Sequence, residues 1–324
     1  MSHPRPLLQV MGLRTEFMTR DGVLPAVADM SFDLSRGEIL GLVGESGSGK
    51  SVTGFSILGL IDPPGRISAG SIVFDGVQLV GAASEALRRL RGKRIAMIFQ
   101  DPMMTLNPVL SIETQMVETV LAHESTSRDA ARRRAVEALR RVGIASASER
   151  LAQYPHQFSG GMRQRVAIAI ALLHSPDLII ADEPTTALDV TVQGQILYEM
   201  QKLVRESGTA LMWITHDLAV VAGLADRIAV MYAGRIVESG DAAAVLDTPR
   251  HPYTRGLLDS VPAVTHPGAR LRQIRGSTPS LLRLGPGCAF LERCDRAVAD
   301  CGTMPALEAN EGRAVRCIRP LEIA

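Results

Sequence analysis

The sequence has almost no net charge and no long hydrophobic segment. Its 35 lysines and arginines nearly balance 34 aspartates and glutamates, for a formal net charge of +1, so its composition does not favour nucleic acid as the main partner. The longest apolar run, residues 166–173, is far shorter than the roughly 20 residues of a membrane-spanning helix. Residues 1–6 lack the basic and then apolar pattern of a secretory signal. We therefore expect a cytosolic protein that associates with a membrane only through a partner.

Cysteine is absent from the first 287 residues and is confined to the end of the chain. The chain from about residue 256 to the first cysteine is rich in proline, glycine, serine and arginine, which predicts an irregular segment. With 324 residues, 46% of them hydrophobic, the chain can form one large domain and a smaller one. We predict a main domain at residues 1–255 and a separate extension at residues 256–324. The four cysteines of this extension are Cys288, Cys294, Cys301 and Cys317.

A glycine-rich loop at residues 44–51 is the first motif that indicates a chemistry. It lies between a predicted buried strand at residues 39–43 and a predicted helix at residues 52–60, the context that the phosphate-binding motif G-x-x-x-x-G-K-[ST] requires. Glycines let backbone N–H groups turn toward phosphate oxygens, and the helix N-terminus adds positive potential. Lys50 would reach the β- and γ-phosphates, and Ser51 would ligate Mg²⁺. The predicted nucleotide-binding residues of the loop are Gly44, Glu45, Ser46, Gly47, Ser48, Gly49, Lys50, Ser51 and Val52.

Two adjacent carboxylates form a second candidate element. The phosphate loop alone is compatible with an ATPase, a GTPase or a kinase, so further residues are needed to tell these enzymes apart. An apolar strand predicted at residues 178–181 is followed directly by Asp182 and Glu183. Asp182 at the strand end suits the water shell of Mg²⁺, and Glu183 suits a general base that polarises the attacking water. An ordinary strand-to-turn boundary is the alternative interpretation, because aspartate and proline are common at such boundaries.

A second glycine-rich segment, residues 157–165 (QFSGGMRQR), lies between these two elements. Ser159 is predicted to be the N-cap of a helix from about residue 162 to residue 173. The two glycines that follow Ser159 expose backbone N–H groups and make a second anion-binding helix end. One nucleotide needs only one such cradle for its terminal phosphate. A second cradle therefore indicates two subunits that meet head to tail, each closing over the nucleotide of the other.

Together these three elements resemble the ABC ATPase family. Residues 158–162 (FSGGM) are similar to the signature motif of the family, with Phe and Met in place of a usual Leu and Gln. The resemblance covers roughly residues 7–250 and implies an α/β fold, a P-loop NTPase cassette with a RecA-like core and an antiparallel β subdomain. It also implies a helical subdomain at about residues 101–175, with ATP and Mg²⁺ as ligands. The signature residues that would contact the ATP of the opposite subunit are Ser159, Gly160, Gly161 and Met162.

The resemblance assigns roles to four further residues. Gln100 matches the glutamine that senses Mg²⁺ and the attacking water, and Asp189 ends the loop at residues 187–189 that matches the one crossing the dimer interface. His216 matches the switch histidine that contacts the γ-phosphate, and Phe17 corresponds to an aromatic residue that stacks on adenine. Each also has an ordinary structural interpretation. Gln100 could be a polar residue that ends a strand, and Asp189 could be a helix cap. His216 could be a histidine in a turn, and Phe17 a hydrophobic side chain on a strand.

Two segments resemble one branch of the family, the ATP-binding subunits of dipeptide and oligopeptide importers, a group that includes nickel importers. They are residues 100–108 (QDPMMTLNP) and residues 251–258 (HPYTRGLL). The resemblance implies a related second ATPase subunit in a heterodimer, two membrane permease subunits and, indirectly, an extracytoplasmic substrate-binding protein. The chain would then act at the cytoplasmic face of the inner (plasma) membrane. The alternatives are a nickel or other small-solute importer, and a soluble ABC protein with a second cassette or long insertion, of which the sequence shows neither.

The four cysteines indicate a metal site. In a reducing cytosol they are poor candidates for two structural disulfides, whereas four thiolates suit either one zinc ion or an iron–sulfur cluster. Zinc sites usually contain closely spaced C-x₂₋₄-C pairs, and this sequence has none. The segment is similar to the C-terminal region of peptide-importer ATPases that carry a [4Fe–4S] cluster. The resemblance therefore implies such a cluster, with zinc and metal-free thiols as the alternatives.

Overall fold

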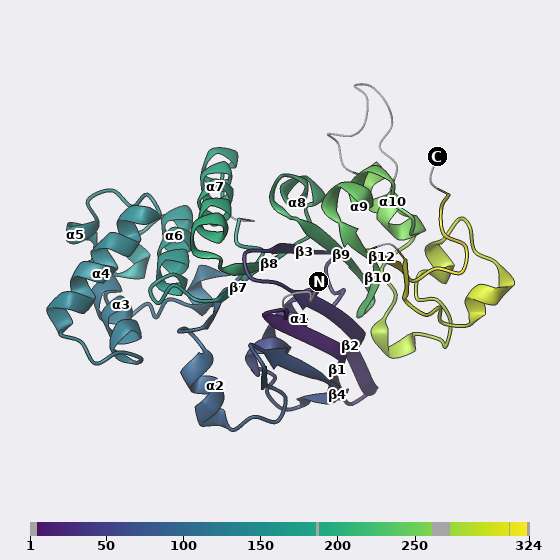
Figure 1. The fold of residues 1–324 in the computed structure, drawn as a ribbon, viewed down its shortest axis with the longest axis horizontal. Coiled ribbons are helices and arrows are strands. Elements are labelled where there is room, and N and C mark those ends of the chain that lie inside the picture. The colour runs from purple at the N-terminus through teal and green to yellow at the C-terminus, as the bar shows by residue number, and fades with distance from the viewer. Residues whose placement is uncertain (1–4, 186–187, 261–272, 311, 323–324) are drawn as a thin grey trace. The chain divides into compact units, whose positions relative to one another are not determined.

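The computed structural model describes residues 5–185, 188–260, 273–310 and 312–322. Within these ranges, no helix is both long and apolar enough to span a bilayer. The chain divides into two compact units, which we describe separately (Figure 1). The first unit comprises Met1–Ser35, Ile39–Gly81 and Trp213–Ala324. The second unit comprises Arg36–Glu38 and Ala82–Met212.

One sheet of the first unit is antiparallel. Its strands are β1 (Leu8–Thr19), β2 (Gly22–Leu34), β4 (Gly65–Phe74) and β5 (Val77–Gln78). They lie in the order β2-β1-β4-β5. β1 pairs antiparallel with β2 on one side and with β4 on the other, and these three strands are labelled side by side in Figure 1. At the start of β1, Leu8 and Val10 are buried, Gln9 between them is half-buried and Met11 is exposed, as expected for a strand with one face on the core. This sheet corresponds to the antiparallel β subdomain that the family resemblance implied.

A second sheet of the first unit carries the phosphate loop at the end of a central strand. Its strands in this unit are β3 (Ile39–Val43), β9 (Arg227–Tyr232), β10 (Arg235–Asp241), β12 (Arg313–Val315) and β11 (Glu308–Asn310). β3 pairs parallel with β9, and the order continues antiparallel through β10 and β12 to β11. All five residues of β3 are buried, as is usual for a strand of a covered parallel sheet. The buried strand predicted at residues 39–43 is therefore confirmed.

The described residues of the first unit form the α-helices α1 (Lys50–Leu58), α8 (Leu218–Leu224), α9 (Ala242–Asp247) and α10 (Pro252–Asp259). α1 begins and ends two residues before the predicted helix at residues 52–60. It ends at Gly59, whose φ of +63° is the left-handed conformation typical of a glycine helix cap. α10 crosses the predicted domain boundary between residues 255 and 256.

The described part of the predicted extension contains little regular structure. In it, the short 3₁₀ helices η4 (Leu281–Arg283), η5 (Leu291–Arg293) and η6 (Ala299–Gly302) precede strands β11 and β12. β12 adds to the sheet by pairing with β10, where Val315 lies opposite Glu238. Residues 261–272, 311 and 323–324 of the predicted extension lie outside the described residues.

The second unit combines a pair of parallel strands with several helices. β6 (Ile95–Ile98) pairs parallel with β7 (Leu178–Asp182), which matches the strand predicted at residues 178–181 and extends it by one residue. β8 (Ala210–Thr215) begins in this unit and ends in the first. The helices are α2 (Ser84–Leu90), η1 (Pro102–Met104), α3 (Ile112–Leu121), α4 (Arg128–Arg141), α5 (Ala147–Arg150), η2 (Pro155–Gln157), α6 (Gly160–Ala171) and α7 (Val190–Ser207).

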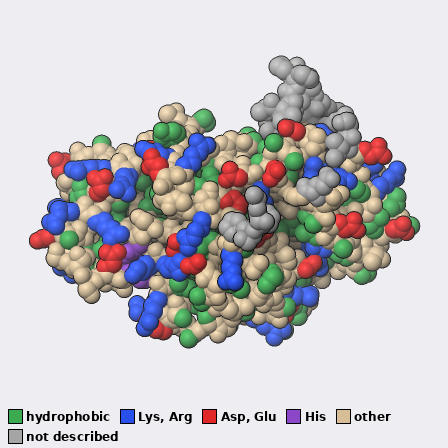
Figure 2. Space-filling model, viewed as in Figure 1, with side chains coloured by type: hydrophobic (Ala, Val, Ile, Leu, Met, Phe, Trp, Pro, Cys, Tyr) green, Lys and Arg blue, Asp and Glu red, His purple; other side chains and the backbone are tan. Residues whose placement is uncertain are grey.

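Surface charge is mixed. On the face shown in Figure 2, lysine and arginine side chains are interspersed with aspartate and glutamate. Many of these charges pair on the surface, as in the salt bridge between Arg88 and Glu85 on α2. The described part of this face therefore shows no continuous basic area of the kind that binds nucleic acid.

Candidate nucleotide site

The loop at residues 44–51 joins β3 to α1 and contacts neighbouring backbone so closely that two of its positions require glycine. A Cβ atom on Gly44 would lie 2.2 Å from the carbonyl oxygen of Met231, and one on Gly49 would lie 2.2 Å from that of Ala26. Gly49 also has a φ of +102° and is the N-cap of α1 without a side-chain hydrogen bond. The loop therefore turns tightly against the sheet and directs the N-terminus of α1 into the turn.

Lys50 lies inside this loop. Its side chain is only 6% exposed, and its Nζ donates hydrogen bonds to the carbonyl oxygens of Gly44 at 2.8 Å and Glu45 at 3.0 Å. The Ser48 hydroxyl is also buried and has no hydrogen-bond partner among the described residues. Ser51 and Val52 are half-buried in the first turn of α1, while Ser46 and Gly47 are exposed at the tip of the loop. The loop thus presents a buried cation and several N–H and O–H donors, which is the donor set that phosphate requires.

Glu45 in the same loop is held by residues that the sequence did not indicate. Its carboxylate accepts hydrogen bonds from Arg293 Nη1 and Nη2 at 2.6 and 3.0 Å and from Thr278 Oγ1 at 2.8 Å. Its backbone N–H donates to the Tyr253 hydroxyl at 2.9 Å. Partial burial acts to raise the pKa of Glu45, but the hydrogen bonds from Arg293 and Thr278 outweigh this effect and lower it. The motif at residues 251–258 contains Tyr253, yet nothing in its pattern indicated a contact with the loop.

The two adjacent carboxylates lie in the second unit, at the end of β7. Asp182 is its last residue and is 3% exposed. Glu183 follows with a φ of +46°, a conformation that is uncommon for a residue with a Cβ and is concentrated at functional sites. Gln100 follows β6, the parallel neighbour of β7, and its Nε2 donates to Glu183 Oε2 at 3.2 Å. The structure thus brings together two residues that the sequence placed 83 positions apart.

The glycine-rich segment near residue 160 also lies in the second unit. The Ser159 hydroxyl accepts a hydrogen bond from the Met162 N–H at 3.3 Å, so Ser159 is the N-cap of α6, as predicted. The helix begins at Gly160, two residues earlier than expected. Ser159 and Gly160 are exposed, whereas Phe158, at a position where the sequence departs from the family motif, is 3% exposed. The N-terminus of α6 is therefore open at the surface of its own unit.

Asp189 is the N-cap of α7 and accepts a hydrogen bond from the Val192 N–H at 3.0 Å. This contact agrees with the interpretation of Asp189 as a helix cap. It does not test the role at a dimer interface that the family resemblance implied. Residues 186–187, which include the first residue of the proposed interface loop, lie outside the described residues.

His216 and Phe17 belong to the first unit, like the phosphate loop. His216 is exposed between β8 and α8, and the neighbouring Asp217 is the residue that caps α8. Phe17 is half-buried on β1, and its ring covers Gly65, where a Cβ would lie 2.5 Å from the ring. Its position agrees with a strand-face hydrophobic residue and leaves part of the ring accessible.

The four cysteines line one small cavity, together with His251, Phe290 and Pro305. Cys301 is 9% exposed and the other three are half-buried. Burial raises the pKa of the thiols of Cys288, Cys294 and Cys317. Among the described residues, no group of three or more His, Cys, Asp or Glu side chains is arranged to hold a single metal ion. The four cysteines that the sequence grouped therefore do line one cavity, although the described residues contain no metal-binding arrangement.

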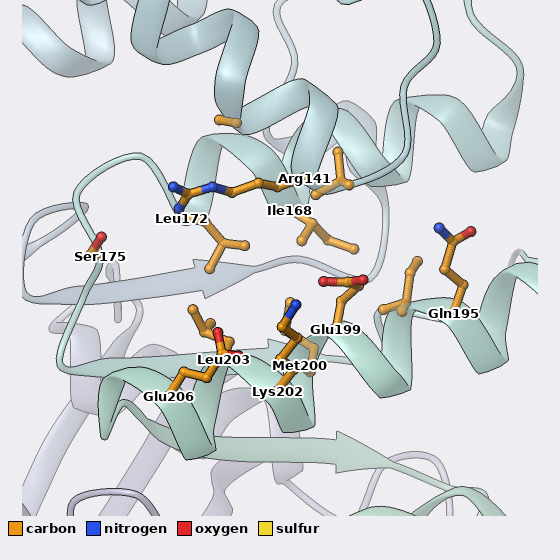
Figure 3. A pocket seen from close by; sticks show the side chains of 13 residues that line it. Arg141, Ile168, Leu172, Ser175, Gln195, Glu199, Met200, Lys202, Leu203 and Glu206 are labelled. Atoms are coloured by element: carbon orange, nitrogen blue, oxygen red, sulfur yellow. The ribbon is translucent and has the colours of Figure 1, made fainter.

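A large groove of the second unit contains none of the predicted site residues. It has a volume of about 350 Å³ and is open to the surface between α4, α6 and α7. In Figure 3, Ile168 of α6 and Leu172, the C-cap of α6, point toward Met200 and Leu203 of α7. The groove therefore lies between apolar helix faces with charged residues, including Arg141 and Lys202, among its lining residues.

Two family models match the chain. Residues 27–186 match the model described as ABC transporter, and residues 237–301 match the model described as Oligopeptide/dipeptide transporter, C-terminal region. The second match includes three of the four cysteines and ends at Cys301.

Known proteins resemble the chain over nearly its whole length. It is 49% identical over 323 residues to the oligopeptide transport ATP-binding protein OppD of Salmonella typhimurium, covering 98% of this chain and 96% of that protein. It is 48% identical over 296 residues to the dipeptide transport ATP-binding protein DppD of Bacillus subtilis, covering 91% and 88%. A solved dimeric ATP-binding cassette in a post-hydrolysis state, bound to ADP and Pi, has a TM-score of 0.66 and 27% identity over 72% of this chain and 98% of its own. The chain therefore belongs to the ABC transporter ATPases, in the family of the oligopeptide and dipeptide transport ATP-binding proteins.

Proposed function

We propose that this chain binds and hydrolyses ATP to power the uptake of oligopeptides or dipeptides through separate membrane permease subunits. The observation that carries the proposal is the near-full-length identity of about one half to OppD and DppD. The match of residues 237–301 to the C-terminal region of oligopeptide and dipeptide transporters supports the same cargo. A nickel or other small-solute importer is the second candidate, because cargo is selected by other subunits.

The loop at residues 44–51 is the proposed site for the phosphates of ATP. Its buried lysine, close backbone turns and helix N-terminus fit such a ligand. Lys50 would contact the β- and γ-phosphates, and Ser51, with Asp182 and Gln100, would complete the surroundings of Mg²⁺. Phe17 would stack on adenine with the accessible part of its ring. Mg²⁺, when bound, would neutralise charge that develops on the phosphates.

Glu183 is the proposed general base for hydrolysis. Gln100 holds its carboxylate in the structure, and the same amide would help to orient the attacking water. The positive φ of Glu183, just after β7, sets the direction in which its side chain leaves the backbone. His216 would contact the γ-phosphate. Glu183 would take a proton from the attacking water as the water oxygen bonds to the γ-phosphorus and the bond between that phosphorus and the bridging oxygen of ADP breaks.

The open N-terminus of α6 supports a second part of the proposal. Because Ser159 and Gly160 are exposed, the signature segment is free to cover the γ-phosphate of an ATP bound by another subunit. We propose that this subunit is a related ATPase that pairs with the chain head to tail, and that Asp189 lies near the interface. ATP turnover would then depend on assembly of the pair.

The cysteine cavity is the proposed site of a [4Fe–4S] cluster. Its four donors are all thiols, which is the ligand set of such clusters. A single zinc ion requires four sulfur atoms at about 2.3 Å from one centre, whereas a cubane cluster holds its thiolates farther apart. That all four cysteines line the same small cavity is the observation that supports a shared cluster. When bound, the cluster would cross-link an irregular segment with little regular structure of its own.

We further propose that the chain acts at the cytoplasmic face of the inner membrane, with two permease subunits that receive cargo from an extracytoplasmic binding protein. An exposed apolar group on η1 and the loop after it offers a permease-binding surface, since Met104 is 70% and Val109 is 75% exposed. The proposed domains remain residues 1–255, with a helical subdomain at about 101–175, and the extension at residues 256–324.

The test is to purify the complex without oxygen, identify its subunits and reconstitute it in liposomes that contain ATP. We expect labelled oligopeptide or dipeptide to accumulate, with iron and sulfide bound to the chain. Glu183→Gln should retain ATP binding and lower ATP turnover at least about 100-fold, whereas Glu206→Gln, an exposed control on α7, should transport normally. Accumulation of nickel instead of peptide would assign the second candidate, and zinc without iron would overturn the cluster.

A further inference from the structure

Arg293, next to one of the cysteines, fixes a residue of the phosphate loop. Its guanidinium forms a two-bond salt bridge with Glu45, at 2.6 and 3.0 Å, and its side chain is only 6% exposed. Such paired, charge-assisted bonds are the most directional contacts that an arginine makes. The two residues are 248 positions apart in the sequence. The cysteine-containing segment near the end of the sequence thus packs directly against the phosphate loop.

The guanidinium of Arg293 makes further contacts besides the salt bridge with Glu45. Its Nε donates to the carbonyl oxygen of Arg275 at 2.9 Å, and its Nη1 also donates to the Tyr232 hydroxyl at 3.3 Å. Its central carbon lies 5.7 Å from the ring centre of Tyr232 and 5.9 Å from that of Phe290, within the range of cation–π attraction. The contact with Glu45 is therefore preorganised.

The aromatic residues beneath Arg293 connect it to the core. The rings of Tyr232 and Tyr253 have centres 4.5 Å apart, and Phe290 lies 5.3 Å from Tyr232 and 5.4 Å from Tyr253. None of the three is more than 4% exposed. Tyr253 in turn accepts the backbone N–H of Glu45. Both the side chain and the backbone of Glu45 are therefore attached to one rigid cluster.

Glu45 matters for nucleotide binding because its carbonyl oxygen accepts a hydrogen bond from Lys50. Its negative side chain, if unpaired, would also repel the phosphates that Lys50 attracts. We propose that Arg293 is a positioning residue of the ATP site: it neutralises Glu45 and holds the loop in the conformation that binds phosphate. This inference rests on the proposed role of the loop in ATP binding, and Arg293 itself is not proposed to touch ATP.

The expected effect is on ATP affinity, because only a fraction of loops without this contact would be ready to bind. We expect Arg293→Ala to raise the Kd for Mg–ATP about tenfold in the purified full-length chain, measured by competition with a fluorescent nucleotide. Arg293→Lys keeps the charge but loses the paired geometry, so its Kd should lie between those of the wild type and the alanine variant.

Arg316→Ala is the matched control. Arg316 lies in the same segment, its side chain is also 6% exposed, and it forms a salt bridge at 3.0 Å, but with Asp29 rather than with the loop. It should destabilise the chain comparably and leave the Kd within about twofold of the wild type, as expected for a site with no shared partner. In a Glu45→Gln background, Arg293→Ala should have little further effect, because the charge to be neutralised is gone.

Equal shifts in Kd for Arg293→Ala and Arg316→Ala would show a merely structural role and overturn the proposal. So would an Arg293→Ala effect of the same size with and without Glu45→Gln. If Arg293→Ala does not fold, the Kd of Arg293→Lys is measured with and without Glu45→Gln instead. An effect of the same size in both backgrounds would again overturn the proposal. Lys50→Ala tests the role of the loop in ATP binding separately from the positioning role of Arg293. Normal ATP binding by this variant would refute the function of the loop itself.

Discussion

Two helix N-termini in this chain are proposed to bind the phosphates of ATP, and they are built in opposite ways. α1 begins behind Gly49, a glycine that makes no side-chain cap, in a loop whose lysine is buried. α6 begins behind Ser159, whose hydroxyl caps the helix at an exposed position. A glycine cap leaves helical N–H groups available to a ligand, whereas a serine cap already occupies one of them.

The surroundings of the two ends differ in the same way. The loop before α1 is held by residues distant in the sequence, including Arg293 and Tyr253. The cap of α6 is local, between residues three positions apart. The first end is thus fixed by contacts with distant residues of the chain, whereas the second is capped locally and is exposed, and under the proposal above it acts on the nucleotide of another subunit. Substitutions at the two ends should therefore affect different steps.

The largest expected effect comes from removing the buried cation of the first end. Lys50→Ala should raise the Kd for Mg–ATP at least about 100-fold in the isolated chain, because a charge-assisted contact to phosphate is lost at a buried position. Competition with a fluorescent nucleotide measures this. Lys202→Ala, at an exposed position of α7, is the control and should bind normally. Retention of affinity by Lys50→Ala would mean that this end does not hold the phosphates.

Sequence reasoning was most accurate where the determinants are local. Strand, loop and helix around residues 44–51 were located to within two residues, because buried β-branched and leucine residues, glycines and a lysine follow one another directly. The cap at Ser159 was identified because serine before a helix has a specific hydrogen-bonding role. The resemblance assigned Gln100, and the motif assigned Glu183, a role toward the attacking water without stating that they meet; the parallel pairing of β6 and β7 explains their contact physically.

The contacts of Glu45 could not be predicted in this way. They depend on how the chain beyond residue 250 packs against the loop, and no local periodicity encodes a salt bridge across 248 positions. Arg293 precedes Cys294, and nothing in the sequence around it indicates a role at the nucleotide loop. For the same reason, the sequence indicated that the four cysteines belong together without indicating that their segment reaches the nucleotide loop.

The second prediction concerns the exposed end. Ser159→Ala should leave the Kd for ATP of the dilute isolated chain within about twofold, because no contact to its own nucleotide is proposed. In the assembled complex the same substitution should lower the maximal ATPase rate about tenfold or more, as expected when a group that contacts the transferred phosphate is lost. Steady-state ATPase assays on the complex and binding assays on the chain separate the two effects.

Ser127→Ala is a matched control for the loss of a cap. Ser127 is the N-cap of α4 and accepts the Ala130 N–H at 3.2 Å, a contact of the same type as that of Ser159. Both substitutions should cost about 1 kcal/mol of stability, and only Ser159→Ala should reduce activity. An equal loss of ATPase activity in both variants would contradict a direct role for the α6 end.

The smallest expected effect is a pH dependence specific to the first end. The pKa of Glu45 is below its ordinary value of 4.5 in the folded chain, where hydrogen bonds from Arg293 and Thr278 outweigh the effect of burial and Lys50 adds to the shift. A carboxyl whose pKa is lower in the folded state contributes stability above its unfolded pKa, and this contribution is lost as the pH falls through the folded value. The other ionisable partners do not titrate there, because the pKa of Arg293 and that of Tyr253 are both raised.

Denaturant unfolding of the wild type and of Glu45→Gln therefore gives a specific expectation. The wild type should be more stable by about 1 kcal/mol at neutral pH, a modest value because Glu45 is partly exposed. This difference should stay constant down to about pH 5 and shrink below pH 4.5. The difference between the wild type and Ser159→Ala should not change over the same range, since a hydroxyl cap does not titrate there. A Glu45→Gln difference that persists unchanged to pH 3 would mean that the loop is held by its backbone contacts and not by the charge pair.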